Sequence, residues 1–302
     1  MNFKYTKTTS DRLDQFLTTK SGDFSRVYWQ KSIKDGCVTI NDKVVTSPAY
    51  RLIAGDKIKL IKELAKIVSN TSPKIDPEVL AETADWIVIN KPAGLASQLH
   101  EDQPGYCLID WFKKYFPAWK KNKLDPERPG LVHRLDKLVS GIMIMAKTNT
   151  MSESLKQQFK DRTIVKKYLA LVDEPINKPS GVINFPLTRG LEGKISAKPN
   201  NEEIGRSAIT EFTVLKNFPH ASYIEVNLKT GRTHQIRAHF LAYGHPLVGD
   251  HRYRPKKRPD KSGLNRVWLH SHELSFTDLQ GERQAFTAPL PPELEDYLTR
   301  FK

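Results

Sequence analysis

Leu131-Val132-His133-Arg134-Leu135-Asp136-Lys137-Leu138-Val139-Ser140-Gly141 leads directly into the apolar run Ile142-Met143-Ile144-Met145-Ala146. The apolar run predicts a buried strand, and the polar residues and glycine before it predict a turn. One carboxylate, Asp136, lies in that turn between the cations of Arg134 and Lys137. An acid held at the start of a buried strand is positioned by rigid structure, as reacting groups tend to be. We therefore treat Asp136 as the candidate reactive group of the chain.

The charge of the chain sets it apart more than its size or its hydrophobicity. Its 302 residues allow two domains, and a hydrophobic fraction of 38% is enough for a sizeable core. The formal net charge of +14 favours a polyanionic partner, either nucleic acid or an anionic membrane face. The sequence has no run of about 18 apolar residues, so it predicts no membrane-spanning helix.

The cysteines and the first residues of the chain indicate the compartment. Cys37 and Cys107 are the two cysteines, and their separation suits neither a disulfide framework nor a zinc site. The residues after Met1 include no apolar stretch, and Asp11 and Asp14 come early. Neither a secretory signal nor an acid-poor transit peptide is therefore expected. We expect a cytoplasmic protein in a reducing compartment.

Beyond residue 82, many short strand patterns alternate with a few helical ones. The helical pattern over 148–162 carries Met151, Leu155 and Phe159 on one face, which predicts a helix packed on a sheet. Such a mixture is typical of an α+β domain, with a mixed, mainly antiparallel sheet and flanking helices. The same periodicities predict strands over 86–90, 165–172, 207–215, 221–228 and 264–277, and helices over 108–116 and from 291.

The chain divides into a small domain, a linker and a large domain. Residues 1–65 combine two short helical patterns with short strand patterns, which predicts a small α/β domain. Residues 66–82 include Ser69-Asn70-Thr71-Ser72-Pro73-Lys74, a polar stretch rich in turn residues, which predicts a linker. Residues 83–302 then form the large domain.

The small domain resembles the S4 RNA-binding domain, first known from a protein of the small ribosomal subunit. The matching residues are Arg12-Leu13-Asp14-Gln15-Phe16-Leu17, Ser25-Arg26, Ile33-Lys34-Asp35-Gly36-Cys37-Val38-Thr39-Ile40-Asn41 and Gly55-Asp56. Cations on one helical surface give RNA affinity that depends little on sequence and weakens with salt. The resemblance implies that four residues face RNA phosphates: Arg12, Arg26, Lys31 and Lys34.

The large domain resembles the RluA-type pseudouridine synthases. The matching blocks, in the family's order, are Asn90-Lys91-Pro92-Ala93-Gly94, His133-Arg134-Leu135-Asp136 with Ser140-Gly141, Lys167-Tyr168-Leu169-Ala170, Thr230-Gly231-Arg232-Thr233-His234-Gln235-Ile236-Arg237, Gly244-His245-Pro246 and Gly249-Asp250. The resemblance implies an enzyme that isomerises uridine in RNA to pseudouridine without a cofactor. In that reaction the base leaves C1′ of the ribose, turns, and rejoins through C5.

By this resemblance, three residues carry out the chemistry. Asp136 attacks the sugar carbon or stabilises its cationic character, as carboxylates do in glycosidases. Abstraction of a proton from the neighbouring sugar carbon is an open alternative. Tyr168 stacks on the flipped uracil, and its hydroxyl serves in removal of the C5 proton. Arg237 pairs with Asp136, which keeps that carboxylate ionised and oriented.

Four further residues are implied as RNA contacts. Arg134 fills the base stack when the target base is extruded, which offsets part of a cost of roughly a few kcal/mol. Lys91, Arg232 and His234 are candidates for contact with phosphate or ribose. His234 and His239 stand five residues apart and do not share a helix face like a zinc pair, so no metal is expected.

The chain departs from the family pattern at two places. Leu138 and Val139 stand where the family usually has a polar pair ending in threonine, so a hydroxyl within the Asp136 loop is missing. The stretch Leu95-Ala96-Ser97-Gln98 also lacks the family's common Val-His-Pro ending. The first departure bears on the support of the loop and leaves Asp136 itself in place.

Large-subunit ribosomal RNA is the expected substrate class, because family members that act on it often carry the appended domain. Transfer RNA is the alternative substrate. The rival function is a non-catalytic RNA-binding or ribosome-assembly protein on the same fold, but Asp136, Tyr168 and Arg237 are all present and favour the enzyme. A base deaminase is excluded because its Cys-x-x-Cys zinc ligands are absent. We expect a monomer, since one active site per chain suffices.

Overall fold

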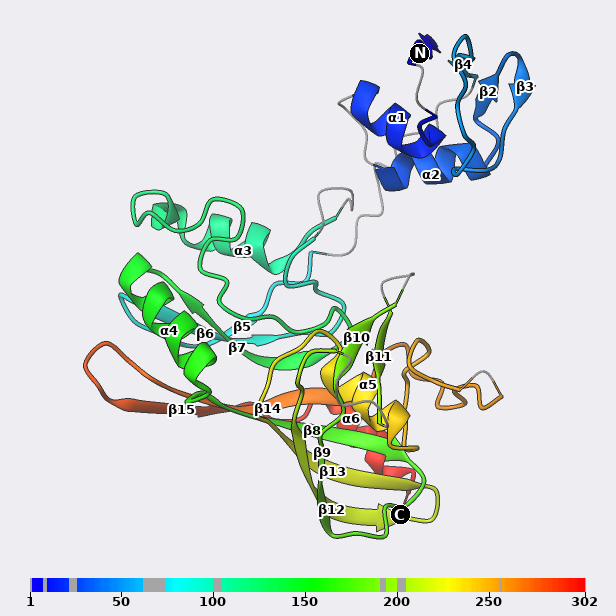
Figure 1. The fold of residues 1–302 in the computed structure, drawn as a ribbon. Coiled ribbons are helices and arrows are strands. Elements are labelled where there is room, and N and C mark those ends of the chain that lie inside the picture. Colours follow the sequence, from blue (N-terminus) through cyan, green and yellow to red (C-terminus); the bar gives the residue numbers. More distant parts are fainter. Residues whose placement is uncertain are drawn as a thin grey trace. The chain divides into compact units, whose positions relative to one another are not determined.

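The computed structural model describes residues 2–7, 10–21, 26–61, 74–99, 105–190, 194–199, 205–255 and 257–301. These residues fold as two compact units, each of which has its own hydrophobic core (Figure 1). The N-terminal unit comprises Met1–Lys74 with Leu99–Tyr106, and the C-terminal unit comprises Ile75–Gln98 with Cys107–Lys302.

The N-terminal unit packs two helices on a four-stranded antiparallel sheet with the strand order β1-β4-β2-β3. Leu13 and Leu17 in one helix and Trp29 and Ile33 in the other stand at i and i+4, and all four are buried in one cluster. The predicted small α/β domain is confirmed. Its elements are β1 (Asn2–Lys4), α1 (Leu13–Ser21), α2 (Arg26–Lys34), β2 (Val38–Ile40), β3 (Lys43–Val44) and β4 (Lys57–Leu60).

A nine-stranded sheet dominates the described part of the C-terminal unit. Its strands run in the order β5-β6-β7-β14-β8-β13-β12-β9, and β15 pairs with β14. Within this described sheet β7 and β14 are parallel and the other neighbours are antiparallel, so the predicted mixed, mainly antiparallel sheet is confirmed. The strands are β5 (Glu78–Glu82), β6 (Trp86–Lys91), β7 (Ser140–Ala146), β8 (Val165–Asp173), β9 (Ser180–Ile183), β12 (Thr210–Phe218), β13 (Ala221–Leu228), β14 (Leu269–Thr277) and β15 (Arg283–Thr287), with β10 (Leu187–Arg189) and β11 (Ile195–Ala197) as a separate antiparallel pair.

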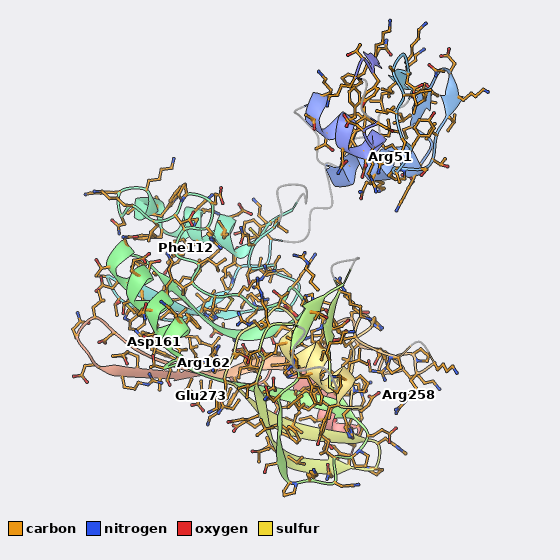
Figure 2. All side chains as sticks on the ribbon, viewed as in Figure 1. Arg51, Phe112, Asp161, Arg162, Arg258 and Glu273 are labelled. Carbon is orange, nitrogen blue, oxygen red and sulfur yellow. The ribbon has the colours of Figure 1, made fainter. Side chains whose placement is uncertain are left out.

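Helices flank the large sheet. Helix α4 (Asn149–Asp161) buries Met151 and Leu155 in a cluster with residues of β6, β7 and β14, as its apolar stripe predicts. The Thr148 hydroxyl caps its first turn, and Arg162 follows its last residue with a left-handed φ of 60° (Figure 2). The other helices are α3 (Leu108–Tyr115), the short 3₁₀ helix η1 (Pro117–Trp119), α5 (Gln235–Ala242) and α6 (Pro292–Thr299).

One boundary differs from the sequence prediction. Residues 66–82 are predicted to be a linker, but Glu78–Glu82 forms strand β5 and pairs with β6 in antiparallel register. This short stretch begins and ends with glutamate, so its sequence pattern alone does not predict a strand. Pairing with the buried β6 makes it one. The first part of the predicted linker, residues 66–73, lies outside the described residues.

The parallel contact between β7 and β14 brings the Asp136 turn to the middle of the sheet. Ser140 and Gly141 pair with His270 and Ser271. Gly141 has a φ of +118°, and a Cβ added to it would lie 2.2 Å from the carbonyl oxygen of Ser271. The glycine that ends the turn is therefore required both by its own backbone conformation and by the close approach of β14.

Gly141→Ala is expected to destabilise the C-terminal unit strongly, because the added methyl group meets backbone atoms that have no room to move. A loss of about 4 kcal/mol or more is expected, which lowers the thermal midpoint by about 10 °C. Differential scanning calorimetry measures this change. Gly190→Ala is the control, since among the described residues the nearest atom to a Cβ there, the Lys194 carbonyl oxygen, is 3.4 Å away. Equal midpoints for the two variants would contradict the role given to Gly141.

Candidate active site

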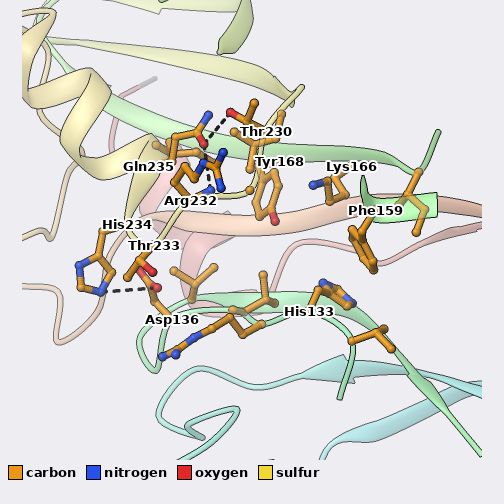
Figure 3. A pocket seen from close by; sticks show the side chains of 18 of the residues that line it. His133, Asp136, Phe159, Lys166, Tyr168, Thr230, Arg232, Thr233, His234 and Gln235 are labelled. Atoms are coloured by element: carbon orange, nitrogen blue, oxygen red, sulfur yellow. Dashed lines mark hydrogen bonds and ion pairs between the residues drawn. The ribbon is translucent and has the colours of Figure 1, made fainter. Parts of the chain in front are cut away.

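A cleft of about 590 Å³ lies beside the turn that carries Asp136 (Figure 3). Its walls are formed by the turn itself, the end of α4, strand β8 and the segment that joins β13 to α5. The structure thus brings together residues that lie far apart in the sequence. The predicted site residues that line the cleft are Asp136, Tyr168, Arg237, Arg134, Arg232 and His234.

The Asp136 turn is held by hydrogen bonds from the segment after β6. The Ser97 hydroxyl donates to the carbonyl oxygen of Leu135 at 2.8 Å and accepts from the Leu135 amide at 3.1 Å. The Gly94 amide donates to the carbonyl oxygen of Lys137 at 2.7 Å. Because these bonds clamp both sides of Asp136, the carboxylate projects from a fixed backbone.

The departure at Leu138 and Val139 therefore does not leave the turn unsupported. The Val139 side chain is buried, and its amide closes the turn by donating to the carbonyl oxygen of Asp136 at 3.1 Å. Ser97 provides a buried hydroxyl from another segment of the chain. Ser97 belongs to Leu95-Ala96-Ser97-Gln98, the other stretch that departs from the family pattern. A hydroxyl from that stretch thus supports the turn in which Leu138 and Val139 supply none.

Arg237 bridges two carboxylates. Its Nη1 donates to Asp136 Oδ2 at 3.0 Å, while Nε and Nη2 donate to the two oxygens of Asp250 at 2.6 and 2.9 Å. Asp250 is fully buried and also accepts from the amides of Arg252 and Tyr253. This two-pronged pairing fixes the plane of the guanidinium group and aims its remaining nitrogen at Asp136.

The charges of this pair reinforce each other despite their burial. Burial disfavours the charged form of Arg237, but Asp250 and then Asp136 outweigh it and raise the pKa of the guanidinium further. Burial also disfavours the Asp250 carboxylate, yet Arg237 and the two backbone amides hold its pKa below the usual range. The cation beside Asp136 is therefore permanent over the whole working pH range.

His234 approaches the other oxygen of Asp136. Its Nε2 lies 3.6 Å from Asp136 Oδ1 (Figure 3). Its Nδ1 lies 2.8 Å from the Tyr253 hydroxyl. Burial lowers the pKa of His234 against the opposite influence of Asp136, and nearby arginines add to the lowering, which favours a neutral ring at pH 7. His234 thus lies beside the Asp136 carboxylate, where a ribose contact is possible, and its neutral ring offers no charge to a phosphate.

Gln235 organises the segment between β13 and α5. Its Oε1 accepts from the Thr230 hydroxyl at 2.8 Å and from the Arg232 amide at 3.0 Å. Its Nε2 donates to the carbonyl oxygen of Ile209 at 3.0 Å and to the Thr210 hydroxyl at 2.9 Å. With its amide fully engaged, Gln235 fixes the path of the segment that carries the arginines of the cleft wall.

Tyr168 points into the cleft from β8 (Figure 3). Burial raises the pKa of Tyr168 to about 12, with a further contribution from Asp136 and an opposing one from a hydrogen bond with Ser271. The phenol therefore keeps its proton at neutral pH. A neutral aromatic ring in a cleft is suited to stacking on a base.

The structure corrects the prediction that Lys91 contacts RNA. Its side chain is fully buried, and Nζ donates to the carbonyl oxygens of Pro92 at 2.9 Å and Leu95 at 2.8 Å. Burial, together with the charge of Arg266, lowers the pKa of Lys91 to about 7 against the pull of Asp136. Through these two hydrogen bonds, Lys91 instead stabilises the segment after β6 that holds the Asp136 turn.

The other predicted cations differ in their surroundings. Arg134 and Arg232 are exposed residues of the cleft wall, where contact with RNA is possible. In the N-terminal unit, Lys31 and Lys34 are exposed on the last turn of α2.

Arg12 is held within its own unit. Its Nε and Nη2 donate to the two oxygens of Asp14 at 2.9 and 3.1 Å, so an RNA phosphate would compete with that carboxylate. The side chain of Arg26 lies outside the described residues. Among the four predicted phosphate contacts, Lys31 and Lys34 thus have the surroundings that the prediction requires.

Sequence reasoning gave no role to Asp250 and Tyr253, although Gly249-Asp250 was part of the family match. Both residues act through others: Asp250 holds Arg237, and Tyr253 bonds His234 and lies under the Arg237 guanidinium at 4.7 Å from its ring centroid. The available signal was the family match at Gly249-Asp250, whereas the role of Asp250 as the counter-charge of a buried arginine becomes visible only in the fold.

The described residues contain no group of three or more His, Cys, Asp or Glu side chains that could hold a metal ion. His239, which was weighed as a partner of His234, is buried with its Nδ1 2.9 Å from the Thr210 hydroxyl and its Nε2 2.9 Å from the Phe185 carbonyl oxygen. Within the same part of the chain, no helix is long and apolar enough to span a membrane.

Comparisons with known proteins agree with this fold. The family model of RNA pseudouridylate synthases matches residues 85–242, and that of the S4 domain matches residues 11–58. The solved structure of human RNA pseudouridylate synthase domain containing 1 superposes with a TM-score of 0.61 at 25% identity, covering 74% of this chain and 87% of that one.

Two relatives match nearly the whole chain. An uncharacterized RNA pseudouridine synthase of Bacillus subtilis is 32% identical over 297 residues, which cover 97% of this chain and 95% of that protein. Ribosomal large subunit pseudouridine synthase D of Neisseria meningitidis (strain MC58) is 32% identical over 305 residues, which cover 95% of this chain and 78% of that protein. The chain belongs to the RNA pseudouridine synthase family. The expected family and enzyme class, with an appended S4 domain, are thus confirmed.

Proposed function

We propose that this enzyme converts specific uridines of large-subunit ribosomal RNA to pseudouridine, in the cytoplasm and as a monomer. Two observations support the substrate class: relatives that align over 95% or more of the chain are named for the large ribosomal subunit, and the chain carries an S4 domain. The net charge of +14 suits a large polyanion. All the residues proposed for the chemistry come from one chain, which is why a monomer suffices.

The observation that carries the proposal is the pairing of Asp136 with the immobilised Arg237 in the cleft. The reaction can begin in two ways: Asp136 attacks C1′ of the ribose, or it abstracts the proton on C2′. In both, the N1–C1′ bond breaks and its electron pair leaves with the uracil. The uracil turns and C5 bonds to C1′, while the carboxylate either leaves C1′ or returns the proton to C2′ and so regains its starting form. The C5 proton leaves to a base, and N1 takes up a proton. Both routes require an ionised carboxylate in a fixed position.

Tyr168 and Arg134 are proposed to handle the base. Tyr168 stacks on the flipped uracil, a role that its neutral ring in the cleft supports. Removal of the C5 proton by its hydroxyl requires the phenolate, which burial disfavours, so stacking is the better supported of its two roles. Arg134 is exposed at the cleft and is proposed to fill the gap that the extruded base leaves in the RNA stack.

The substrate class is tested with RNA from a strain that lacks the gene. Protein-free large-subunit RNA, small-subunit RNA and transfer RNA, each labelled with tritium at C5 of uridine, are incubated separately with the purified enzyme. Tritium release from the large-subunit RNA alone is expected, because forming the C5–C1′ bond expels the C5 hydrogen. Release from transfer RNA alone would overturn the proposed substrate class and leave the enzyme class intact.

Deletion of residues 1–65 is expected to weaken RNA binding about tenfold or more and to flatten its salt dependence. The S4 domain contributes cations such as Lys31 and Lys34, and each lost phosphate contact reduces the salt slope by about one unit. Fluorescence anisotropy at several salt concentrations measures both effects. The rate of the bound complex should change less than the affinity, and unchanged affinity would refute the role given to this domain.

A further inference from the structure

Lys166 is a cation of the cleft that the proposed chemistry does not use. It lies on β8, two residues before Tyr168, and its ammonium group is 5.3 Å from the centroid of the Phe159 ring (Figure 3). His133 packs on the same Phe159 ring, with the two ring centroids 4.9 Å apart. Alternate residues of a strand share one face, so Lys166 and Tyr168 present their side chains to the cleft about 7 Å apart.

The charge of Lys166 has no carboxylate partner among the described residues. Its neighbour in the chain, Lys167, lies 3.0 Å from Glu273 and 4.0 Å from Glu225 on the other face of the sheet. By contrast, Lys166 is partly buried, and burial alone lowers its pKa to about 8. A partly buried cation without a counter-charge is unfavourable in the free protein, and an anionic ligand would relieve that cost.

The surroundings of Lys166 favour a phosphate as this ligand. His133 is no competing charge, because burial lowers its pKa to about 3 and its Nε2 accepts from the Ile144 amide. Gly231 leaves the ammonium group open on another side, since a Cβ there would lie 3.4 Å from Nζ. A nucleotide whose base stacks on Tyr168 carries its own linking phosphates within a few ångströms of that base.

We propose that Lys166 binds a phosphate group of the RNA strand next to the uridine that stacks on Tyr168. The identification of the ligand as RNA rests on the proposed function, whereas the anion preference follows from the site itself. An electrostatic contact at this position holds the flipped nucleotide by its backbone. It therefore acts on any uridine in the cleft and contributes no base selectivity.

The test joins a protein change to an RNA change. The probe is a stem-loop of large-subunit RNA around a uridine whose conversion is located by chemical mapping of pseudouridine. The phosphates 5′ and 3′ of that uridine are replaced one at a time by uncharged methylphosphonates. Dissociation constants are measured by anisotropy for the full-length wild type, Lys166→Met and Lys166→Arg, with Lys167→Met as the control for the loss of one positive charge.

One of the two uncharged linkages is expected to weaken wild-type binding about tenfold, and Lys166→Met is expected to weaken binding of the normal RNA by a similar factor. The uncharged linkage should then have no further effect on Lys166→Met, while Lys166→Arg and Lys167→Met respond to it like the wild type. If each uncharged linkage weakened binding of Lys166→Met by the same factor as it weakens wild-type binding, the two losses would be independent and the phosphate assignment would be wrong. Because binding is measured, this result is separate from a failure of the enzyme assay.

A pH series adds a readout that a merely structural lysine would not change. Since Lys166 loses its proton as the pH rises through about 8, wild-type affinity should fall above that pH more steeply than the affinity of Lys166→Arg, which stays charged. His133 stays neutral throughout this range. Parallel pH curves for the two proteins would contradict the proposal. The other charged or titratable groups that line the cleft are Arg128, Arg134, Asp136, Lys160, Arg162, Lys229, Arg232, His234 and Arg237.

Discussion

Asp136→Asn is expected to reduce the rate of pseudouridine formation by about 10⁴-fold or more and to leave RNA binding nearly unchanged. Asparagine keeps the shape of the side chain and its bond to Arg237, but it neither attacks a sugar carbon nor accepts its proton. The measurement is tritium release from C5-labelled large-subunit RNA under single-turnover conditions, with the dissociation constant measured separately.

Asp161→Asn is the matched control for the loss of one carboxylate. Asp161 is exposed at the end of α4 and bonds only Gln157 among the interactions found for its side chain in the described structure (Figure 2). Its rate should equal that of the wild type. An Asp136→Asn enzyme that works within tenfold of the wild type would remove Asp136 from the chemistry, whatever its effect on binding.

Asp250→Asn is expected to lower kcat by about 10²- to 10³-fold with a much smaller change in KM. An amide retains one acceptor for Arg237 but not the negative charge, so the buried guanidinium has only Asp136 to balance it and draws that carboxylate away from substrate. Losing one partner of a buried pair also costs about 3–5 kcal/mol of stability. Rates are therefore referred to the folded fraction, which circular dichroism determines.

Tyr253→Phe provides a graded comparison for Asp250→Asn. It removes the hydroxyl that bonds His234 and accepts from the Ile195 amide, and it leaves both the ring under Arg237 and the backbone amide that bonds Asp250. A smaller fall in kcat, about tenfold, is expected. If Asp250→Asn lost stability but kept the wild-type kcat in its folded fraction, Asp250 would have no positioning role in the reaction.

Contiguous motifs made the centre of the site predictable from the sequence. Asp136, Tyr168 and Arg237 each belong to a block whose residues are adjacent in the chain, and the structure places all three in one cleft. The roles of Asp250 and Lys166 were not predicted, because each role depends on the neighbours of the side chain in the fold. Asp250 pairs with Arg237, whereas Lys166 has no carboxylate partner among the described residues. No local pattern distinguishes a lysine with a carboxylate opposite from one without.

Burial at the ends of elements was the least predictable feature. Lys91 follows an apolar strand and precedes a turn, which is typical of an exposed cation, yet backbone carbonyls surround its ammonium group. The parallel pairing of β7 with β14 was also beyond the reach of periodicity, since register between distant strands depends on the whole sheet. The glycine at 141 was visible in the sequence, and only the closeness of Ser271 explains it.

The central claim is that the Asp136 cleft makes pseudouridine in cellular RNA, and mapping that RNA tests it most directly. Pseudouridines are mapped chemically in total RNA from cells that lack the gene and from the same cells supplied with the wild-type or the Asp136→Asn protein. We predict one or a few positions in large-subunit ribosomal RNA that are uridine without the gene, pseudouridine with the wild type, and uridine again with Asp136→Asn. Identical maps for all three strains, or full restoration by Asp136→Asn, would contradict it.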